Sequence, residues 1–339
     1  MKIGILGAGS WAIALSTLLD DNGHRVKMWE FNEKDAQLLR QKREHPVKLP
    51  GIKIPESVEI TSNVGDLFDD SEYIVVAVPA QFVRATMKTL AKEIPVEKTD
   101  KICGWVIVSK GIENETNALL TEVIKQEIPH ISADKLAVLS GPSHAEEVGR
   151  KLPTTVLAAS TNDELARKTQ QIFSNNVFRV YTSNDVIGVE LAGSVKNVIA
   201  VAAGACDGLG YGDNTKGALL TRGIAEMVRL GLKMGAQEHT FSGLAGFGDL
   251  ITTCCSKYSR NRNFGELVAS GLSLQEALQK MTMVAEGVTT VKSVYALSQK
   301  MGIDMPITSE VYNALYKGKN PQDIVTDLMT REPKAERVV

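Results

Sequence analysis

Cysteine is scarce in this sequence, and its few occurrences form no recognisable pattern. The 339 residues contain four cysteines, Cys103, Cys206, Cys254 and Cys255. Their spacing matches neither a zinc site nor the dense disulfide framework of a small secreted domain. We therefore expect reduced, mostly structural cysteines and no bound metal.

An excess of charge of one sign is also lacking. The net charge is −2, with 23% charged and 43% hydrophobic residues, an ordinary globular composition. Nothing in it indicates a nucleic-acid or membrane-surface partner. The N-terminus has no basic region followed by a cleavage site, so we expect a cytoplasmic protein. The length predicts about two domains.

No long hydrophobic run is free of charged residues. The best candidate for a membrane span, residues 186–209, contains Glu190 and Lys196. In a bilayer this segment would place an ammonium group near the apolar centre. We therefore interpret it as a buried core helix and expect no membrane span.

The N-terminus carries a dinucleotide-binding fingerprint. An apolar strand over residues 2–6 runs into Gly7-x-Gly9-x-x-Ala12, and a helical pattern follows at once. Gly7 permits the tight turn, Gly9 lets the backbone approach a pyrophosphate, and Ala12 allows close helix-to-strand packing. The free amide groups and the dipole of the helix start would face the phosphates. This pattern implies NAD(H) or NADP(H) as cofactor.

Strand and helix patterns alternate through the first 185 residues. The expected strands cover residues 2–6, 25–29, 73–78, 106–109, 136–139 and 155–159. The continuous apolar run at 73–78 is typical of a strand buried on both faces of a parallel sheet. We predict that residues 1–185 form a Rossmann-like α/β domain with a mostly parallel, doubly wound sheet. Ligands of such sheets bind at the carboxyl ends of the strands.

From residue 186 onward the pattern is helical. Helical periodicity covers residues 186–205, 215–234, 263–270, 273–280, 288–300 and 309–317, with Gly or Pro between the segments. We predict that residues 186–339 form an all-helical domain that binds the substrate and carries catalytic groups.

Lys196 stands inside a helix built of small and apolar residues. Its neighbours one turn away include Ala192, Gly193 and Ala200, which offer little charged surface. Snorkelling to the surface is the ordinary fate of such a lysine. Here the apolar surroundings favour a partly desolvated amine with a lowered pKa, suited to exchanging a proton with an alcohol or carbonyl oxygen.

A second polar stretch runs from Leu244 to Asn263. Three glycines precede Asp249, so the backbone can turn sharply there; Asp249 is either a carboxylate held at a site or a helix N-cap. Arg260 and Asn261 come just before an expected helix, where a guanidinium, an amide and free helix-start N–H groups suit a phosphate monoester. We expect Arg262 to be solvated.

Six motifs together resemble one enzyme family. In chain order they are Gly7-Ala-Gly-Ser-Trp11, Ser109-Lys110-Gly-Ile, Ser140-Gly-Pro-Ser143-His-Ala145, Glu190-x5-Lys196-Asn197, Leu244-Ala-Gly-x-Gly-Asp249 and Ser259-Arg260-Asn261. This set is similar to the NAD(P)-dependent glycerol-3-phosphate dehydrogenase family, of the bacterial biosynthetic type. The resemblance spans residues 2–328 and implies a helical domain like that of 6-phosphogluconate dehydrogenase.

The resemblance also implies residue roles. The implied catalytic residues are Lys196, which transfers the proton, Lys110 and Asp249. The implied cofactor contacts, added to Gly7, Gly9, Ala12 and Glu30, are Ser10, Trp11, Phe31, Lys110, Ala145, Arg260, Val284 and Glu286. The implied substrate contacts are Lys110, Gly141, Ser143, Lys196, Asn197, Asp249, Ser259, Arg260 and Asn261.

The activity that follows is the reversible reduction of dihydroxyacetone phosphate to sn-glycerol 3-phosphate, which feeds glycerophospholipid synthesis. A ketopantoate-type reductase would share the two-domain plan and a helix-borne lysine, but it would bind a carboxylate substrate. A non-catalytic dinucleotide sensor would need the fingerprint but not Lys110, Lys196, Asp249 and Arg260 together. We also expect a homodimer, because the helical domain offers apolar faces.

The choice between NAD and NADP depends on the end of the second strand. Glu30 lies about 20 residues beyond the glycines, where an acidic residue can bond the ribose hydroxyls of NAD and repel the extra phosphate of NADP. Ala12, by contrast, is a variant that occurs in NADP-binding proteins. We expect a preference for NADH, to be measured as initial rates with the two cofactors.

Overall fold

The computed structural model describes residues 1–333, 335 and 336, and its chain divides into two compact units. The first unit comprises Met1–Ser109 and Leu120–Val186. The second comprises Lys110–Leu119 and Ile187–Val339, of which residues 334 and 337–339 lie outside the described residues. The sequence-based domains, 1–185 and 186–339, place residues 110–119 with the first domain, whereas these residues pack with the helical unit.

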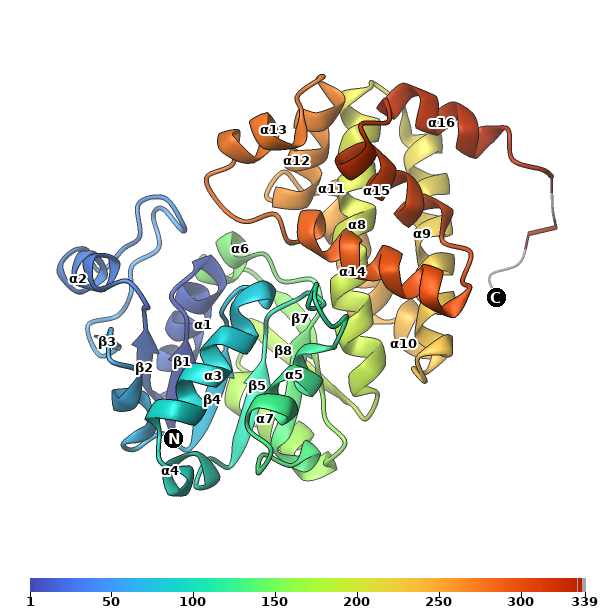
Figure 1. Cartoon of the computed structure of the whole chain (residues 1–339). Coiled ribbons are helices and arrows are strands. Elements are labelled where there is room, and N and C mark those ends of the chain that lie inside the picture. Colours follow the sequence, from blue (N-terminus) through green and yellow to red (C-terminus); the bar gives the residue numbers. More distant parts are fainter. Residues whose placement is uncertain (334, 337–339) are drawn as a thin grey trace. The chain divides into compact units, whose positions relative to one another are not determined.

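The first unit is built on one eight-stranded sheet (Figure 1). The spatial order is β3-β2-β1-β4-β5-β6-β7-β8, and every neighbouring pair is parallel except β6 and β7. The strands are β1 (Lys2–Leu6), β2 (Arg25–Trp29), β3 (Glu59–Thr61), β4 (Tyr73–Val76), β5 (Gly104–Ile107), β6 (Leu136–Ser140), β7 (Thr154–Ala159) and β8 (Phe178–Ser183). The predicted mostly parallel α/β domain is confirmed.

The register of the central strands aligns their carboxyl ends. Leu6 at the end of β1 pairs with Trp29 of β2 and with Val76 of β4. The four residues of β4 are all buried, as the continuous apolar run indicates. The loops that follow these strands therefore emerge at one edge of the sheet, where open α/β sheets bind ligands.

Helices connect the strands of the first unit (Figure 1). They are α1 (Ser10–Asp21), α2 (Glu33–Lys42), η1 (Val64–Phe68), η2 (Ala80–Phe82), α3 (Val83–Glu93), α4 (Val96–Asp100), α5 (Leu120–Glu127), η3 (Ala133–Lys135), α6 (Ala145–Gly149) and α7 (Asp163–Phe173). The helix that bears the fingerprint, α1, buries Ala12, Ile13 and Leu15 in the core shared with β1 and packs against α6.

Among its described residues, the regular secondary structure of the second unit is all helical, and the segment Lys110–Leu119 is irregular (Figure 1). Its helices are α8 (Val186–Gly208), α9 (Asp213–Lys233), α10 (Glu238–Ser242), the π-helical turn η4 (Leu244–Gly248), α11 (Asp249–Cys255), α12 (Arg260–Ala269), α13 (Leu274–Lys280), α14 (Glu286–Met301), α15 (Pro306–Lys317) and α16 (Pro321–Met329). All six predicted helices are present, and α10, η4, α11 and α16 are additional to them.

The long helix α8 is the centre of the second unit. It is long and apolar enough to cross a membrane, but 83% of its apolar window is buried inside the protein, so the interpretation as a core helix is confirmed. Its neighbours approach to backbone contact. A Cβ atom added to Gly265 would lie 2.0 Å from the Val201 carbonyl oxygen, and one on Gly287 would lie 2.4 Å from that of Asn197. Glycine on α12 and α14 thus lets both helices pack directly on α8.

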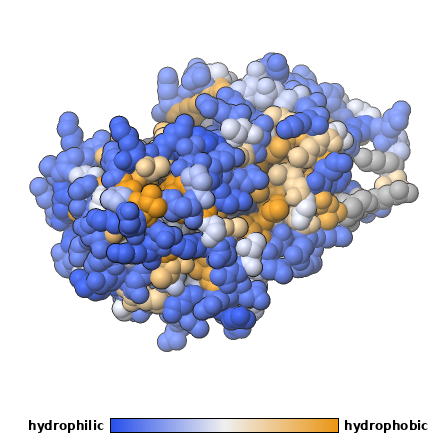
Figure 2. Space-filling view, turned by 60° about the horizontal axis from the view of Figure 1, so that its bottom comes forward, coloured by the Kyte–Doolittle hydropathy of each residue, from blue (hydrophilic) through white to orange (hydrophobic). Residues whose placement is uncertain are grey.

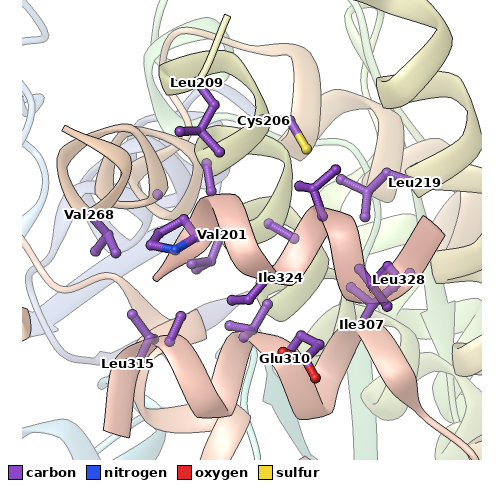
Figure 3. Close-up of a pocket in the computed structure, with 17 residues that line it drawn as sticks. Val201, Cys206, Leu209, Leu219, Val268, Ile307, Glu310, Leu315, Ile324 and Leu328 are labelled. Atoms are coloured by element: carbon purple, nitrogen blue, oxygen red, sulfur yellow. The ribbon is translucent and has the colours of Figure 1, made fainter. Parts of the chain in front are cut away.

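An apolar cavity lies among α8, α9, α12, α15 and α16. It has a volume of about 70 Å³ and is lined mainly by aliphatic side chains such as Val201, Leu219, Ile324 and Leu328 (Figure 3). None of the predicted site residues lines it. Because it offers almost no polar groups, it lacks the donors that a phosphorylated substrate needs.

Candidate functional site

The turn between β1 and α1 has the geometry that the fingerprint predicts. Gly7 has a φ of +111°, and a Cβ atom there would lie 3.0 Å from the carbonyl oxygen of Ala77. Both the backbone conformation and the contact require glycine. At Gly9 an added Cβ atom would meet nothing within 4 Å, so this residue faces open space. The backbone is accordingly bare where a pyrophosphate would approach.

The start of α1 is suited to holding an anion. Gly9 is the N-cap, no side chain caps the helix, and its first turn has no acidic residue. Ala12 is completely buried, as the close packing of α1 on the sheet demands. The N–H groups of the first turn, beginning with Ser10 and Trp11, therefore have no capping side chain. These residues fit a dinucleotide pyrophosphate.

Glu30, which follows β2, is partly neutralised by a neighbouring lysine. The residue is only 8% exposed, its Oε1 accepts a hydrogen bond from the Asn32 N–H at 3.1 Å, and its Oε2 lies 3.3 Å from Lys48 Nζ. A carboxylate paired in this way repels a cofactor phosphate less than a free one does. The expected preference for NADH is therefore modest.

Two of the predicted cofactor contacts are unusually exposed apolar side chains. Phe31 is 81% exposed and rests edge-on against Trp29 in the first unit, and Val284 in the second unit is 47% exposed. Figure 2 shows a mainly hydrophilic surface interrupted by hydrophobic patches. The exposed aromatic face of Phe31 can stack on an adenine ring.

The remaining predicted residues of the first unit follow β6. Gly141 has a φ of +141°, and a Cβ atom there would lie 3.0 Å from Val156 Cα, so glycine is required. The Ser143 hydroxyl donates to the Gly141 carbonyl oxygen at 3.1 Å. Ala145 begins α6, which packs on the fingerprint helix α1. The fold thus brings the β6 loop and the fingerprint to the same part of the first unit.

The second unit holds a charged cluster of two lysines and one aspartate. Lys110 Nζ donates to Asp249 Oδ2 at 2.7 Å, and Lys196 Nζ donates to Asp249 Oδ1 at 2.8 Å. The side chains of Lys196 and Asp249 are only 6% and 2% exposed, while that of Lys110 is 18% exposed. One buried carboxylate therefore binds both predicted catalytic lysines, one on each oxygen.

Local backbone structure places Asp249 at this position. The π-helical turn η4 precedes it, and a Cβ atom on Gly246 would lie 2.1 Å from the carbonyl oxygen of Phe241. Asp249 is the first residue of α11, whose N-cap is Gly248. Of the two interpretations that the sequence leaves open, the side chain fits a carboxylate held at a site.

Burial and charge act against each other in the cluster. Burial lowers the pKa of Lys196 to about 8, because the attraction of Asp249 only partly offsets desolvation and Lys110 adds repulsion. The desolvation expected for this lysine is confirmed, since its side chain is 6% exposed. Burial by itself would raise the pKa of Asp249, but the two ammonium groups outweigh it and hold that pKa below its ordinary value. Asp249 is therefore ionised at neutral pH.

Thr253 belongs to the cluster and was not predicted. Lys196 Nζ lies 2.5 Å from its hydroxyl oxygen, and this hydroxyl donates to Asp249 Oδ1 at 3.3 Å. Thr253 is four residues after Asp249, so the two share one face of α11. This i, i+4 spacing is the signal in the sequence that could have identified it.

The predicted phosphate-binding segment forms the start of α12. Ser259 is the N-cap, its hydroxyl accepting a hydrogen bond from the Arg262 N–H, and Arg260 is the first helical residue. Among the described residues no carboxylate pairs with Arg260, whose guanidinium is thus available to a ligand. The expectation that Arg262 is solvated is wrong: it pairs with Asp207 at 2.6 Å and Glu266 at 2.8 Å. Its long side chain reaches Asp207 on α8.

Asn261 links three helices. Its amide nitrogen donates to Asn197 Oδ1 on α8 at 2.9 Å, and its amide oxygen accepts from the Gly287 N–H on α14 at 2.8 Å. Glu286, a predicted cofactor contact, begins α14. Asn261 is only 8% exposed and already makes these two bonds, so its direct contact with a phosphate stays a prediction.

All four cysteines are free, and Cys254 and Cys206 are buried. Burial raises the pKa of the Cys254 thiol, which keeps it protonated and unreactive. A search of residues 1–333, 335 and 336 finds no group of three or more His, Cys, Asp or Glu side chains that could hold a metal ion.

Comparison with known proteins agrees with this geometry. Family models described as the N-terminus and C-terminus of NAD-dependent glycerol-3-phosphate dehydrogenase match residues 2–166 and 185–326. The chain is 49% identical over 336 residues to a glycerol-3-phosphate dehydrogenase [NAD(P)+] of Chlorobium phaeobacteroides, covering 99% of both chains.

Solved structures give the same result at the level of the fold. The glycerol-3-phosphate dehydrogenase of Coxiella burnetii superposes with a TM-score of 0.92 at 35% identity, covering 97% of this chain and 99% of that one. A ketopantoate reductase of Ralstonia eutropha has a TM-score of 0.59 at 12% identity, covering 97% of this chain and all of that one. The latter shares the fold alone. The predicted resemblance is confirmed, and the chain belongs to the NAD(P)-dependent glycerol-3-phosphate dehydrogenase family of oxidoreductases.

Proposed function

We propose that this protein catalyses the reversible reduction of dihydroxyacetone phosphate by NAD(P)H to sn-glycerol 3-phosphate. The observation that carries the proposal is the buried Lys110–Asp249–Lys196 cluster in a member of this family. Reduction of a ketone needs a proton donor at the carbonyl oxygen, and the cluster contains one with a pKa near neutrality. A guanidinium such as that of Arg260 can bind a carboxylate as well as a phosphate, so the choice of dihydroxyacetone phosphate over a ketopantoate-type substrate rests on the family to which the chain belongs.

The first unit contributes the cofactor site. When bound, the nicotinamide cofactor supplies the hydride that reduces the carbonyl carbon. The amide groups at the start of α1 bind the pyrophosphate, and Gly9 leaves room for it. Phe31 offers an exposed aromatic face for the adenine.

The second unit contributes the proton and the positive potential. Lys196 donates its proton to the developing alkoxide in reduction and accepts it back in oxidation. Lys110 adds positive potential that stabilises the negative oxygen, an effect of about 3 kcal/mol for a well-placed donor. Asp249 and Thr253 hold the Lys196 amine in place through the hydrogen bonds described above.

Arg260 is proposed to bind the substrate phosphate. We expect Arg260→Ala to raise the KM for dihydroxyacetone phosphate by about tenfold or more, because a charge-assisted hydrogen bond contributes roughly 1.5–3 kcal/mol. Steady-state kinetics with Arg262→Ala as matched control test this expectation. The guanidinium of Arg262 is already paired with Asp207 and Glu266. Equal KM values for the two variants would remove Arg260 from the phosphate site.

The pKa of Lys196 predicts opposite pH dependences for the two directions of the reaction. The ammonium form is needed for reduction, so we expect kcat/KM to be level below pH 8 and to fall above it. Oxidation needs the neutral amine, so its kcat/KM rises through the same range. Measurement between pH 7 and 10 avoids the second phosphate ionisation of the substrate, which lies near pH 6. A reduction rate that stays constant across this range would contradict the assignment.

An absorbance assay separates the candidate activities. NADH oxidation is followed with dihydroxyacetone phosphate and, in parallel, with ketopantoate. We expect turnover of the first substrate only. Turnover of ketopantoate would support the alternative reductase, and no turnover of either would support a dinucleotide sensor.

Several finer features belong to the same proposal. We expect NADH to be preferred over NADPH because of Glu30, to a degree limited by its pairing with Lys48. Supply of glycerol 3-phosphate to phospholipid synthesis, a cytoplasmic location and a homodimer fit the composition and the family. Sedimentation velocity of the purified chain tests the oligomeric state.

A further inference from the structure

Lys110 lies at the point where the chain passes from one unit to the other. The preceding residue, Ser109, is anchored in the first unit, where its hydroxyl donates to the carbonyl oxygens of Val78 at 2.5 Å and Val76 at 3.2 Å. Lys110 itself is bound to Asp249 in the second unit. The position of the Lys110 ammonium therefore depends on what fixes the segment Lys110–Leu119 within the helical unit.

A hydroxyl group on α14 contacts this segment. Ser293 is completely buried, and its Oγ lies 3.2 Å from the carbonyl oxygen of Ile112, 3.1 Å from that of Glu113 and 2.7 Å from Asn114 Oδ1. All three partners are acceptors, so the single hydroxyl proton is shared among them. One of them, Ile112, is only two residues beyond Lys110.

Two hydrogen bonds within the segment fix its shape rather than its place. The Glu113 N–H donates to the Ala118 carbonyl oxygen at 3.1 Å, and the Asn117 N–H donates to that of Glu113 at 3.0 Å. These bonds would move with the segment if it shifted. The bonds from Ser293 differ because α14 is packed on α8, where Gly287 meets the backbone of Asn197. The bonds from Ser293 therefore fix the segment relative to α8, the helix that carries Lys196.

We propose that Ser293 is a positioning residue that holds the segment Lys110–Leu119 on α14 and thereby keeps the Lys110 ammonium on Asp249. The proposal rests on the proposed function for its kinetic consequences but not for its structural ones. Ion pairing weakens with distance, and a displacement of about 1 Å in a catalytic group costs up to about 10²-fold in rate. The buried hydroxyl of Ser293 thus helps to position the Lys110 ammonium, whose residue belongs to neither α8 nor α11.

The electrostatics of the cluster provide a specific signature. Lys110 repels the ammonium form of Lys196 and so contributes to its lowered pKa. If Lys110 moves away from Asp249, this repulsion weakens and the pKa of Lys196 rises. The pH above which kcat/KM for reduction falls then also rises. Loss of packing alone gives a slower or less stable enzyme without moving this pH.

The test compares Ser293→Ala with Ser298→Ala in the full chain. Ser298 is on the same helix and is 1% exposed, but its hydroxyl donates to the Tyr295 carbonyl oxygen within α14. We expect Ser293→Ala to lower kcat for dihydroxyacetone phosphate about tenfold. We also expect the fall of kcat/KM for reduction with rising pH, called here the descending limb of the pH profile, to shift to higher pH. The KM for NADH stays unchanged. Ser298→Ala should match the unsubstituted protein in each measurement.

A second measurement does not depend on turnover. Acetylation of Lys110 by dilute acetic anhydride, followed by mass spectrometry, reports how firmly the amine is held. We expect faster labelling of Lys110 in Ser293→Ala than in Ser298→Ala, with other lysines unchanged. If the unsubstituted protein lacks activity with dihydroxyacetone phosphate, the proposed function fails and the labelling comparison still decides the inference.

Two results would overturn the inference. Equal Lys110 labelling in the two variants would show that Ser293 does not hold the amine. A drop in kcat with an unmoved pH limb would assign Ser293 a purely structural role. Thermal melting of both variants verifies that each is folded, and Ser293→Cys, a weaker donor of similar size, is expected to give intermediate values if Ser293→Ala unfolds.

Discussion

Replacing Lys196 with methionine is expected to lower kcat for dihydroxyacetone phosphate reduction by about 10²-fold or more while leaving the Kd for NADH nearly unchanged. Methionine has a similar length and is an apolar side chain common in protein cores, so the substitution removes the proton donor without opening a large cavity. Lys196 is 5% exposed on α8, so bulk water has little access to its amine.

Two controls separate proton transfer from damage to the helix. Ser194→Ala alters another buried residue of α8, whose hydroxyl donates only to the Glu190 carbonyl oxygen, and should leave kcat within about twofold of the original. Lys196→Met should also abolish the pH limb near 8 that belongs to the amine. Near-normal turnover, or a persisting limb, would assign the proton to another group.

The sequence was sufficient for features that depend on local chemistry. The roles of Gly7, Gly9 and Ala12 follow from backbone conformation and residue size, and the structure gives each residue the predicted surroundings. The desolvation of Lys196 could be predicted because a helix places residues three and four apart on one face. Its small, apolar neighbours in the sequence therefore indicate burial.

Features that depend on long-range contacts could not be predicted from local patterns, and only the family resemblance placed Lys110 and Asp249 in one catalytic set. Lys110 and Asp249 are 139 residues apart in the chain, and no local pattern assigns the segment around Lys110 to the helical unit. The pairing of Arg262 could not be predicted either, because only the packing of α12 on α8 places Asp207 beside it. Ser293 is an ordinary helical serine until its contacts with residues 112–114 are known.

Two strands, β3 and β8, were not predicted from the sequence for a different reason, namely their short length and partial exposure. The strand β3 has three residues, too few for a periodic pattern. In β8, at the edge of the sheet, the alternation of buried and exposed residues covers only Phe178–Tyr181, which is short for a period-two pattern. Their absence from the prediction did not affect the site, because both strands lie at the edges of the sheet and the fingerprint lies near its centre.

Asp249→Asn is expected to impair both catalysis and stability. The substitution leaves two ammonium groups beside a neutral amide in a buried site, and breaking a buried ion pair typically costs about 3–5 kcal/mol. For a unit of this size that corresponds to a fall in Tm of roughly 10 °C. We expect kcat for reduction at pH 7.5 to fall by about 10²-fold or more, because Lys196 loses the carboxylate that orients it and favours its protonated form.

Asp207→Asn is the matched control for this variant. Asp207 also binds two cations with one carboxylate, Lys216 at 2.5 Å and Arg262 at 2.6 Å, and its side chain is 14% exposed. Its loss should lower Tm without moving the pH dependence of reduction. Asp249→Asn should instead move the descending limb to lower pH, since the charge that raises the pKa of Lys196 is gone.

The direction of that shift is the decisive observation. Asp249→Asn removes an attraction from Lys196 and lowers its pKa, whereas Ser293→Ala weakens the repulsion from Lys110 and raises it. A general loss of packing has no reason to displace one limb in opposite directions in two variants of the same unit. Shifts of opposite sign would therefore assign the limb to Lys196 and its two charged neighbours, and shifts of the same sign would contradict that assignment.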